Sequence, residues 1–337
     1  MHVARNGQTA TLLPDGSVLV VGGYNDTTGT GSANDSLSSA ELYSLRTRTW
    51  TLTGHLRTAR SFHTATLLRS GQVLVAGGYG PTGAPLASAE IYTPRTHRWT
   101  PTGAMTSAHA EGTATLLRDG RVLVAGGSTA SARAVARVDL YDPHTGRWTS
   151  TGPMTVSRYR QTATLLPNGQ VLVTGGRDTA DTPLASAELY DPHTGRWTRT
   201  GAMHGRRWNH TATLLSDGQV LVAGATETTF ADLIGHPNRG FATGPDAELY
   251  DPTTRRFTIT GPMTTDRADQ AAVLLRTASV LVVGGSCGGT YVNGKPTDAR
   301  CLATLASATL LPNGTVLVAG GVGTSDVVLA SAEVYTP

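Results

Sequence analysis

SRYRQTATLLPNGQVLVTGG occupies residues 157–176, and its second half is the repeat that decides the fold. TATLLPNGQVLVTGG returns as TATLLRSGQVLVAGG at 64–78 and as TATLLRDGRVLVAGG at 113–127. The element TATLL begins at residues 9, 64, 113, 162 and 211, and weaker copies begin at 271 and 307. Seven copies indicate a repeat protein, in which each unit packs against its neighbours.

Each copy contains four short segments that are typical of β-strands. TATLL and the apolar run VLVxGG are separated by turn sequences such as PNG or DG, in which asparagine or glycine supplies a positive φ. The apolar run is typical of a strand buried on both faces. A third segment ends in tyrosine, and a fourth carries tryptophan or phenylalanine seven residues later. So small a unit cannot bury its own faces, so we expect the units to stack as blades around an axis.

The double glycine, the tyrosine and the tryptophan together resemble the kelch family of β-propellers, and TLLPDGSVLVVGG (residues 11–23) resembles the propeller of the galactose-oxidase relatives. The resemblance implies an all-β, seven-bladed kelch-type propeller with a degenerate sixth blade and an incomplete last blade, and a six-bladed ring is the alternative. We expect a single domain over residues 1–337, with blades starting near residues 9, 64, 113, 162, 211, 271 and 307. Kelch propellers include enzymes, lectin-like binders and partner-binding domains, so the resemblance leaves the function open.

Two parts of the chain depart from the repeat. Only residues 286–306 separate the sixth copy from the seventh, and GTYV and RCLATL are the candidate strands there. The chain ends before a fourth segment of the last copy, so we expect either a three-stranded last blade or a longer natural chain. Cys287 and Cys301 fall in the first irregular part, where they predict either a local disulfide, and hence an oxidising compartment, or two unpaired thiols.

Composition and charge narrow the classes of partner. The net charge is +3, the arginines form no basic block, and Lys295 is the one lysine, which argues against nucleic acid. No apolar run reaches the roughly 18 residues that a membrane helix needs. We therefore expect a soluble monomer with neither a nucleic-acid nor a membrane partner. Localisation stays open, and secretion with a signal peptide absent from this chain is compatible with the sequence.

A carboxylate in the third segment and an arginine before the first segment recur together. The acids are Glu41, Glu90, Asp139, Glu188, Glu248 and Glu333, and the arginines are Arg5, Arg60, Arg158, Arg207 and Arg267. Because both recur in register, we interpret them as structural ion pairs rather than catalytic groups. His109 replaces the arginine in the third copy, which leaves the pairing open there. The tyrosines and tryptophans are interpreted as wedges between blades.

Linker lengths separate two faces of the predicted propeller. The first-to-second and third-to-fourth turns are constant in length, so they form a tight face. On the other face, each link between blades is constant in length, but its last three residues vary. These are Asn6-Gly7-Gln8, Ser61-Phe62-His63, Ala110-Glu111-Gly112, Tyr159-Arg160-Gln161, Trp208-Asn209-His210 and Ala268-Asp269-Gln270. Constant geometry with varied side chains is typical of a binding surface, so we expect one asymmetric site at the axial mouth.

The mouth and its neighbouring loops supply the candidate residues. The candidate catalytic residues are Glu111, His210, Tyr159, His63 and Asp269, since acid–base chemistry needs such a group within hydrogen-bond reach of a substrate. The candidate ligand-binding residues, which add stacking faces and arginine clamps, are Phe62, His109, Arg160, Gln161, Trp208, Asn209, Arg177, Asp178, Glu227, Asn6, Gln8 and Gln270. The long insert at 226–244 is expected to be either a lid over the axis or a packed Ω-loop.

Three functions remain open, in order of preference. The first is a module that binds a small molecule, glycan or peptide at the mouth. The second is a metal-free lyase, isomerase or cyclase, and the third is a protein-interaction scaffold. No cofactor or metal is predicted, although His63, His109, His210 and Glu111 are metal-ligand types. The galactose-oxidase resemblance implies a Tyr–Cys cross-link and a Tyr/His copper set, but both cysteines lie in the irregular segment and no Tyr-His pair occurs.

Overall fold

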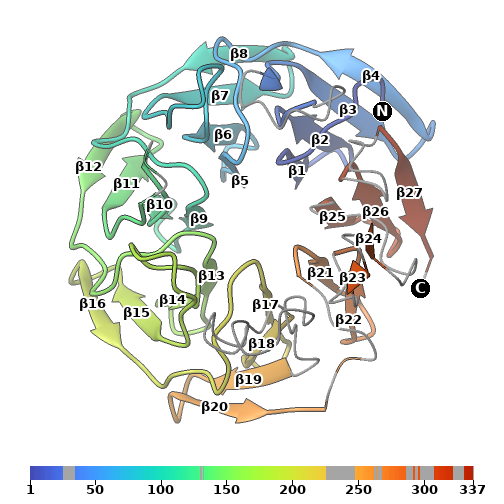
Figure 1. Cartoon of the computed structure of the whole chain (residues 1–337). Helices are drawn as coiled ribbons and strands as arrows, with labels where there is room; N and C mark the ends of the chain where they lie inside the picture. Colours follow the sequence, from blue (N-terminus) through green and yellow to red (C-terminus); the bar gives the residue numbers. More distant parts are fainter. Residues whose placement is uncertain are drawn as a thin grey trace.

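The computed structural model of the chain is an all-β ring of small sheets around a central axis (Figure 1). The structure describes residues 1–25, 35–129, 131, 133–224, 247–261, 263, 268–285, 291–292, 295–296, 307–321 and 330–336. Within these ranges, no helix has the length and apolar character needed to cross a membrane.

Five antiparallel sheets have four strands each. The first consists of β1 (Thr9–Leu12), β2 (Val18–Val21), β3 (Ala40–Ser44) and β4 (Thr49–Thr53). The second consists of β5 (Thr64–Leu67), β6 (Val73–Ala76), β7 (Ala89–Thr93) and β8 (Arg98–Pro101). The third consists of β9 (Thr113–Leu116), β10 (Val122–Ala125), β11 (Val138–Asp142) and β12 (Arg147–Ser150). The fourth consists of β13 (Thr162–Leu165), β14 (Val171–Thr174), β15 (Ala187–Asp191) and β16 (Arg196–Arg199). The fifth consists of β17 (Thr211–Leu214), β18 (Val220–Ala223), β19 (Ala247–Asp251) and β20 (Arg256–Ile259).

Three smaller sheets complete the described strands. A three-stranded sheet consists of β25 (Ser307–Leu310), β26 (Val316–Ala319) and β27 (Ala332–Tyr335). The two-stranded sheets are β21 (Ala271–Leu274) with β22 (Val280–Val283), and β23 (Tyr291–Val292) with β24 (Lys295–Pro296). β23 falls within the predicted strand GTYV, whereas RCLATL, Cys287 and Cys301 lie outside the described residues.

Six sheets thus have three or four strands, as the six-bladed alternative predicts. A complete seventh blade is not present among the described residues, because the sheet β21–β22 has two strands only. β21 contacts both β17 and β25, and β25 contacts β1, so the inner strands still close a ring (Figure 1).

The second strand of each of the first four repeats is fully buried because its two faces pack on different neighbours. Val18 and Val20 of β2 lie in a cluster with Leu311 and Leu317 of the last sheet. The alternate residues of β2 lie in a cluster with β6 residues, Tyr92 and Trp99 of the second blade. The predicted wedges are confirmed, since the Tyr92 hydroxyl bonds Thr53 of the preceding blade at 2.8 Å.

The predicted structural ion pairs are confirmed in the four copies that combine a described arginine with its acid. Arg158 is fully buried and donates to Gly175 O at 2.7 Å, to Ser186 O at 3.1 Å and to Glu188 Oε1 at 2.8 Å. Glu188 in turn accepts the backbone N–H groups of Thr155 and Val156 at 2.7 and 3.1 Å. The pair therefore ties the link, the third strand and the glycine turn of one blade together.

The double glycine is required by the approach of the next blade. Gly22 has a φ of 58°, and a Cβ there would lie 2.5 Å from Arg60 O. Gly23 has a φ of 90°, and its N–H donates to the same carbonyl at 2.9 Å. Any larger residue would push the arginine of the next blade out of place.

In the third copy His109 takes the place of the arginine. Its Nδ1 lies 2.6 Å from Gly126 O and its Nε2 lies 3.3 Å from Asp139 Oδ2. The imidazole thus makes the arginine's contacts to the glycine carbonyl and to the acid, and the structure assigns His109 to the scaffold. Arg267 lies outside the described residues.

Replacing Arg158 by methionine should lower the free energy of unfolding by about 3–5 kcal/mol, because Glu188 would remain buried without its cation. Urea denaturation of wild type and variant measures the difference. The control is Arg121→Ala, which breaks an exposed pair with Asp119 and should cost less than about 1 kcal/mol. Equal losses in both variants would contradict a structural role for the buried pair.

Candidate functional site

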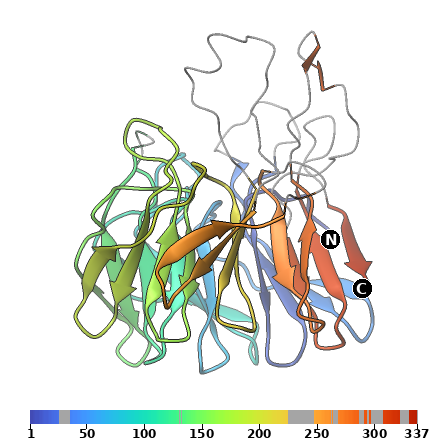
Figure 2. The same ribbon diagram turned by 90° about the horizontal axis from the view of Figure 1, so that it is seen from below.

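The links between blades enter the inner strands on the face opposite the tight turns (Figure 2). The second residue of each link triplet has a positive φ: Gly7, Phe62, Glu111, Arg160, Asn209 and Asp269, with values from 51° to 64°. This left-handed conformation costs roughly 1–2 kcal/mol for most residues. It is therefore notable that three of the six are neither glycine, asparagine nor aspartate.

A chain of backbone hydrogen bonds explains this shared conformation. The N–H of Phe62 donates to Gly7 O at 2.8 Å, and the N–H of Glu111 donates to Phe62 O at 3.1 Å. The series continues through Arg160, Asn209 and Asp269, with distances of 3.0–3.2 Å. Each blade is thus bonded to the next at the mouth, and the series orders the six residues around the axis.

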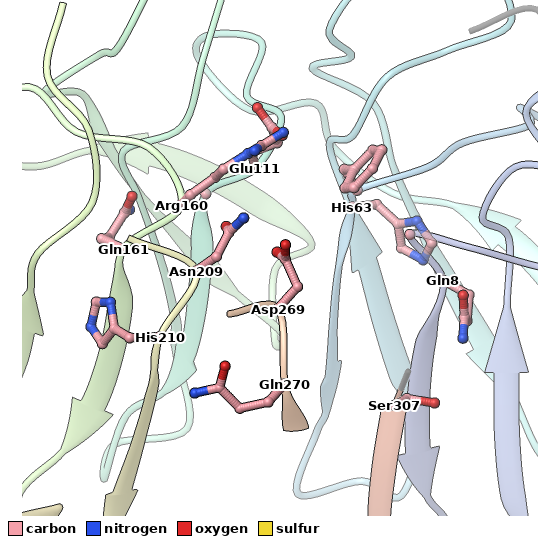
Figure 3. Close-up of a pocket in the computed structure, with 13 residues that line it drawn as sticks. Gln8, His63, Glu111, Arg160, Gln161, Asn209, His210, Asp269, Gln270 and Ser307 are labelled. Carbon is pink, nitrogen blue, oxygen red and sulfur yellow. The ribbon is translucent and has the colours of Figure 1, made fainter. Parts of the chain in front are cut away.

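A cavity of about 330 Å³ opens inside this circle (Figure 3). All six left-handed residues line it, together with Gln8, His63, Gly112, Gln161, His210, Gln270 and Ser307. The volume is at the lower end of the range for small-molecule sites. A second space of about 400 Å³ is lined mainly by threonines and alanines of the inner strands and shares Gly112, Gln161 and His210 with the first.

The side chain of the third residue bonds to the preceding blade in the five link triplets whose third residue is not glycine. The side-chain N–H of Gln161 donates to Ala125 O at 2.9 Å, and Gln270 donates to Ala223 O at 2.7 Å. His63 Nε2 lies 2.9 Å from Thr9 Oγ1, and His210 Nε2 lies 3.0 Å from Thr162 Oγ1. Burial together with nearby arginines lowers the pKa of each histidine to about 3. His63 and His210 are therefore neutral near pH 7 and unsuited to the acid–base role for which they were candidates.

Glu111 and Arg160 form the one salt bridge among the residues described around the cavity. Glu111 Oε1 lies 2.6 Å from both Arg160 Nε and Nη2. Glu111 Oε2 accepts a hydrogen bond from the Tyr79 hydroxyl at 3.1 Å, and burial with this carboxylate raises the pKa of Tyr79 to about 12. Glu111 is 6 % exposed and Arg160 34 %, so the guanidinium is the part of the pair that reaches solvent.

Asp269 differs from the side chains above because its carboxylate has no hydrogen-bond partner among the described residues. No hydrogen bond to its carboxylate is made by any described residue, and its Oδ1 is buried without a partner. Burial, reinforced by the charge of Glu111, raises the pKa of Asp269 to about 6, against the opposing effect of Arg160. Figure 3 shows Asp269 in the middle of the view, with Glu111 and Arg160 above it and Gln270 below it. A buried carboxyl without a donor is unfavourable in the free protein.

The other candidates lie beside the cavity rather than in its lining. The hydroxyl of Tyr159 donates to Asp181, and burial with this carboxylate raises the pKa of Tyr159 to about 12. The guanidinium of Arg177 lies 3.8 Å from the centre of the Trp208 ring, and that of Arg160 lies 5.4 Å from it.

Asn6 and Asp178 make local hydrogen bonds to neighbouring side-chain and backbone groups. Asn6 is buried and bonds the Tyr24 hydroxyl, and Asp178 accepts N–H groups of its own loop. Glu227 and the insert at 226–244 lie outside the described residues.

Sequence reasoning did not identify Tyr79 and Ser307. Tyr79 follows a double glycine, as Tyr24 does, but serine or arginine takes this place in the next two copies. Ser307 opens the last inner strand, in the position held by threonine in five other copies.

The Kelch motif matches residues 7–54, 60–106, 112–155 and 158–204, which together exceed half of the chain. The chain belongs to the kelch family. No curated protein matches the sequence. Two solved structures are similar to this kelch propeller. A fungal alcohol oxidase of the AA5 family in complex with copper has a TM-score of 0.73, with 16% identity over 99% of this chain and 74% of that chain. YjhT has a TM-score of 0.64, with 12% identity over 98% of this chain and 95% of that chain. At these identities the likeness concerns the fold.

The described mouth residues of this kelch propeller do not match the copper set that the galactose-oxidase resemblance implies. Within the described ranges, no three His, Cys, Asp or Glu side chains gather as a metal site would require. The Nε2 atoms of His63 and His210 are also both occupied by threonine hydroxyls. We derive no chemistry through a metal from these residues.

Asp269→Asn should stabilise the protein at high pH. Because the pKa of Asp269 is raised to about 6 from 3.8, the folded state holds a proton that the unfolded state has already lost between these values. Stability therefore falls as the pH rises through about 6, and the variant avoids this loss. We expect it to be more stable by about 3 kcal/mol at pH 8 and nearly equal at pH 4, as measured by urea denaturation. A constant difference across this range would contradict the assignment.

The imidazoles of His63 and His210 should stay neutral between pH 8 and pH 5. Their pKa of about 3 places protonation well below this range. Nitrogen-15 chemical shifts of the histidine side chains provide the measurement, with His63→Gln and His210→Gln variants to assign the signals. Titration of either ring near pH 6.5 would restore it as an acid–base candidate.

Proposed function

We propose that this kelch propeller binds a small polar ligand in the cavity at the axial mouth, through Asp269, Arg160, Asn209 and the ring of Phe62. The observation that carries the proposal is the Asp269 carboxyl, which faces the cavity without a donor from the described protein. An unpaired buried polar atom is costly, and a bound ligand that supplies a donor removes that cost.

The composition of the cavity lining supports a polar ligand of modest size. Arg160 and Asn209 offer hydrogen-bonding groups, and Phe62 offers one aromatic surface, packed edge-on against Tyr79 at 6.2 Å. About 330 Å³ accommodates a ligand the size of one sugar unit or a small amino compound rather than a folded protein surface. The site is asymmetric, since each blade contributes a different side chain.

A second candidate function is acid–base catalysis at the same site. It is favoured by the pKa of about 6 for Asp269, which lies close to neutrality. Tyr159, with a pKa of about 12, and the two neutral histidines are poorly matched to proton transfer near pH 7. In this alternative, Asp269 would exchange a proton with the substrate while Arg160 orients it.

We also propose that the hairpin β21–β22 is the inner half of a shortened blade, which makes the ring seven-bladed. In support, Arg276 in its turn donates to Pro312 O of the following turn. The same bond joins Arg69 to Arg118 O and Arg118 to Pro167 O in neighbouring four-stranded blades. An experimental structure in which β22 has no outer partner from residues 286–306 would contradict this count.

Removing a polar group of the mouth should weaken ligand binding without unfolding the protein. In a thermal-shift screen of monosaccharides, amino sugars, amino acids and polyols, we expect a hit that stabilises wild type by mass action. Asn209→Ala and Asp269→Asn should each weaken its binding roughly tenfold or more in calorimetry. Asp119→Asn, in a turn on the opposite face, is the control. A hit that binds all four proteins equally would place the ligand elsewhere.

Turnover of the same hit separates the two functions. If Asp269→Asn abolishes turnover but retains binding, the protein is an enzyme with Asp269 as its acid or base. If wild type binds the compound without converting it, binding is the function.

A further inference from the structure

The buried atoms that lack partners around the cavity include four oxygens. They are Oε1 of Gln8, Gln161 and Gln270 and Oδ1 of Asp269. The amide nitrogens of the three glutamines already donate to carbonyls of the preceding sheets at 2.7–3.0 Å. This fixes the orientation of each amide, so each glutamine has only a carbonyl oxygen left to offer.

These four oxygens are buried, so leaving them without hydrogen-bond donors is unfavourable. Gln161 is 5 % exposed and Gln270 is 8 % exposed, and both line the cavity. A buried acceptor without a partner is unfavourable, and a donor that reaches it from the cavity removes this cost. The Nδ1 atoms of His63 and His210 also lack partners, and both rings are uncharged.

The charges around the cavity leave one carboxylate unbalanced. The charged groups described near Asp269 are Glu111, on the link to β9, and Arg160, on the link to β13. These two neutralise each other at 2.6 Å. From the links to β5 and β17, only Phe62, His63, Asn209 and His210 line the cavity, and all four are uncharged. The arginines of these links, Arg60 and Arg207, are buried in their pairs with Glu90 and Glu248. With Asp269 ionised, the described lining carries one net negative charge and a surplus of acceptors.

We infer that the ligand of this site carries a protonated amine, which binds the Asp269 carboxylate while its further N–H or O–H groups donate to the glutamine carbonyls. This inference rests on the proposed function and names the ligand class. The Asp269 carboxylate would repel an anionic ligand. A neutral polyol would bind without neutralising the charge of Asp269. An ammonium group supplies both the charge and the donors, and a charge-assisted hydrogen bond is about twice as strong as a neutral one.

The test uses two matched pairs of probes that differ only in one group: D-glucosamine with D-glucose, and D-galactosamine with D-galactose. Calorimetry at pH 7, where Asp269 is ionised, should show the amino member of a pair binding roughly tenfold or more tightly than its partner. At pH 4.5 the carboxyl is protonated while the amine keeps its charge, so this preference should largely vanish.

Variants of Asp269 test whether this side chain causes the tighter binding of the amino sugars. Asp269→Asn should remove the preference at pH 7. Asp269→Glu should retain it, since Glu111 shows that glutamate is accommodated at this position of the link. Asp119→Asn should behave as wild type. Circular dichroism and the melting temperature establish that each variant is folded.

The outcomes separate the inference from the function on which it rests. If both members of a pair bind equally to wild type, and Asn209→Ala weakens both, the mouth is a binding site but the ligand is not selected by an amine. A thermal shift caused by calcium or potassium chloride but by neither amino sugar would assign the oxygens to a metal ion, which also overturns the inference. If none of the four probes binds at millimolar concentration but a compound without an amine does, the inference alone is contradicted. If no compound of the wider screen binds, the proposed function is contradicted as well.

Discussion

A buried arginine–carboxylate pair, present in four of the five four-stranded blades, is the interaction on which the rest of the molecule depends. Its guanidinium binds a glycine carbonyl after the second strand and the acid of the third strand, as Arg158 does with Gly175 and Glu188. The acid also accepts two N–H groups of the incoming link. Because burying either charge alone is costly, the link has one path across the top of the blade. Its constant length in the sequence follows from this path.

Beyond the arginine, three residues remain before the inner strand, and they are used in different ways. The second residue, in a left-handed conformation, joins its blade to the preceding one by a backbone hydrogen bond, as the N–H of Arg160 does by donating to Glu111 O. The third reaches back to the preceding blade, as Gln161 does to Ala125 O. The hydrogen bonds between neighbouring blades thus use backbone groups and side-chain N–H donors. Side-chain oxygens around the axis remain without donors.

At the mouth, residues bonded to other protein groups can be distinguished from those left to bind a ligand. The histidines are bonded to threonines and uncharged, so they belong with the structural contacts. Glu111 is engaged by Arg160 and Tyr79, whereas Asp269 has no described partner. A propeller can vary such residues freely, since its stability comes from packing between blades and from the arginine pairs.

The sequence alone determined the repeat, the turn types, the double glycines, the arginine–acid pairs and the location of the variable triplets, because each recurs at a fixed spacing. The partners of the third triplet residue, the strained backbone of Phe62, Glu111 and Arg160, and the isolation of Asp269 were decided by tertiary structure. The strand content of the blades was also decided there, because the sixth copy begins like the others but contributes only the two-stranded sheet β21–β22 among the described residues. Spacing along one chain specifies contacts within a blade, but contacts between blades depend on how the ring closes.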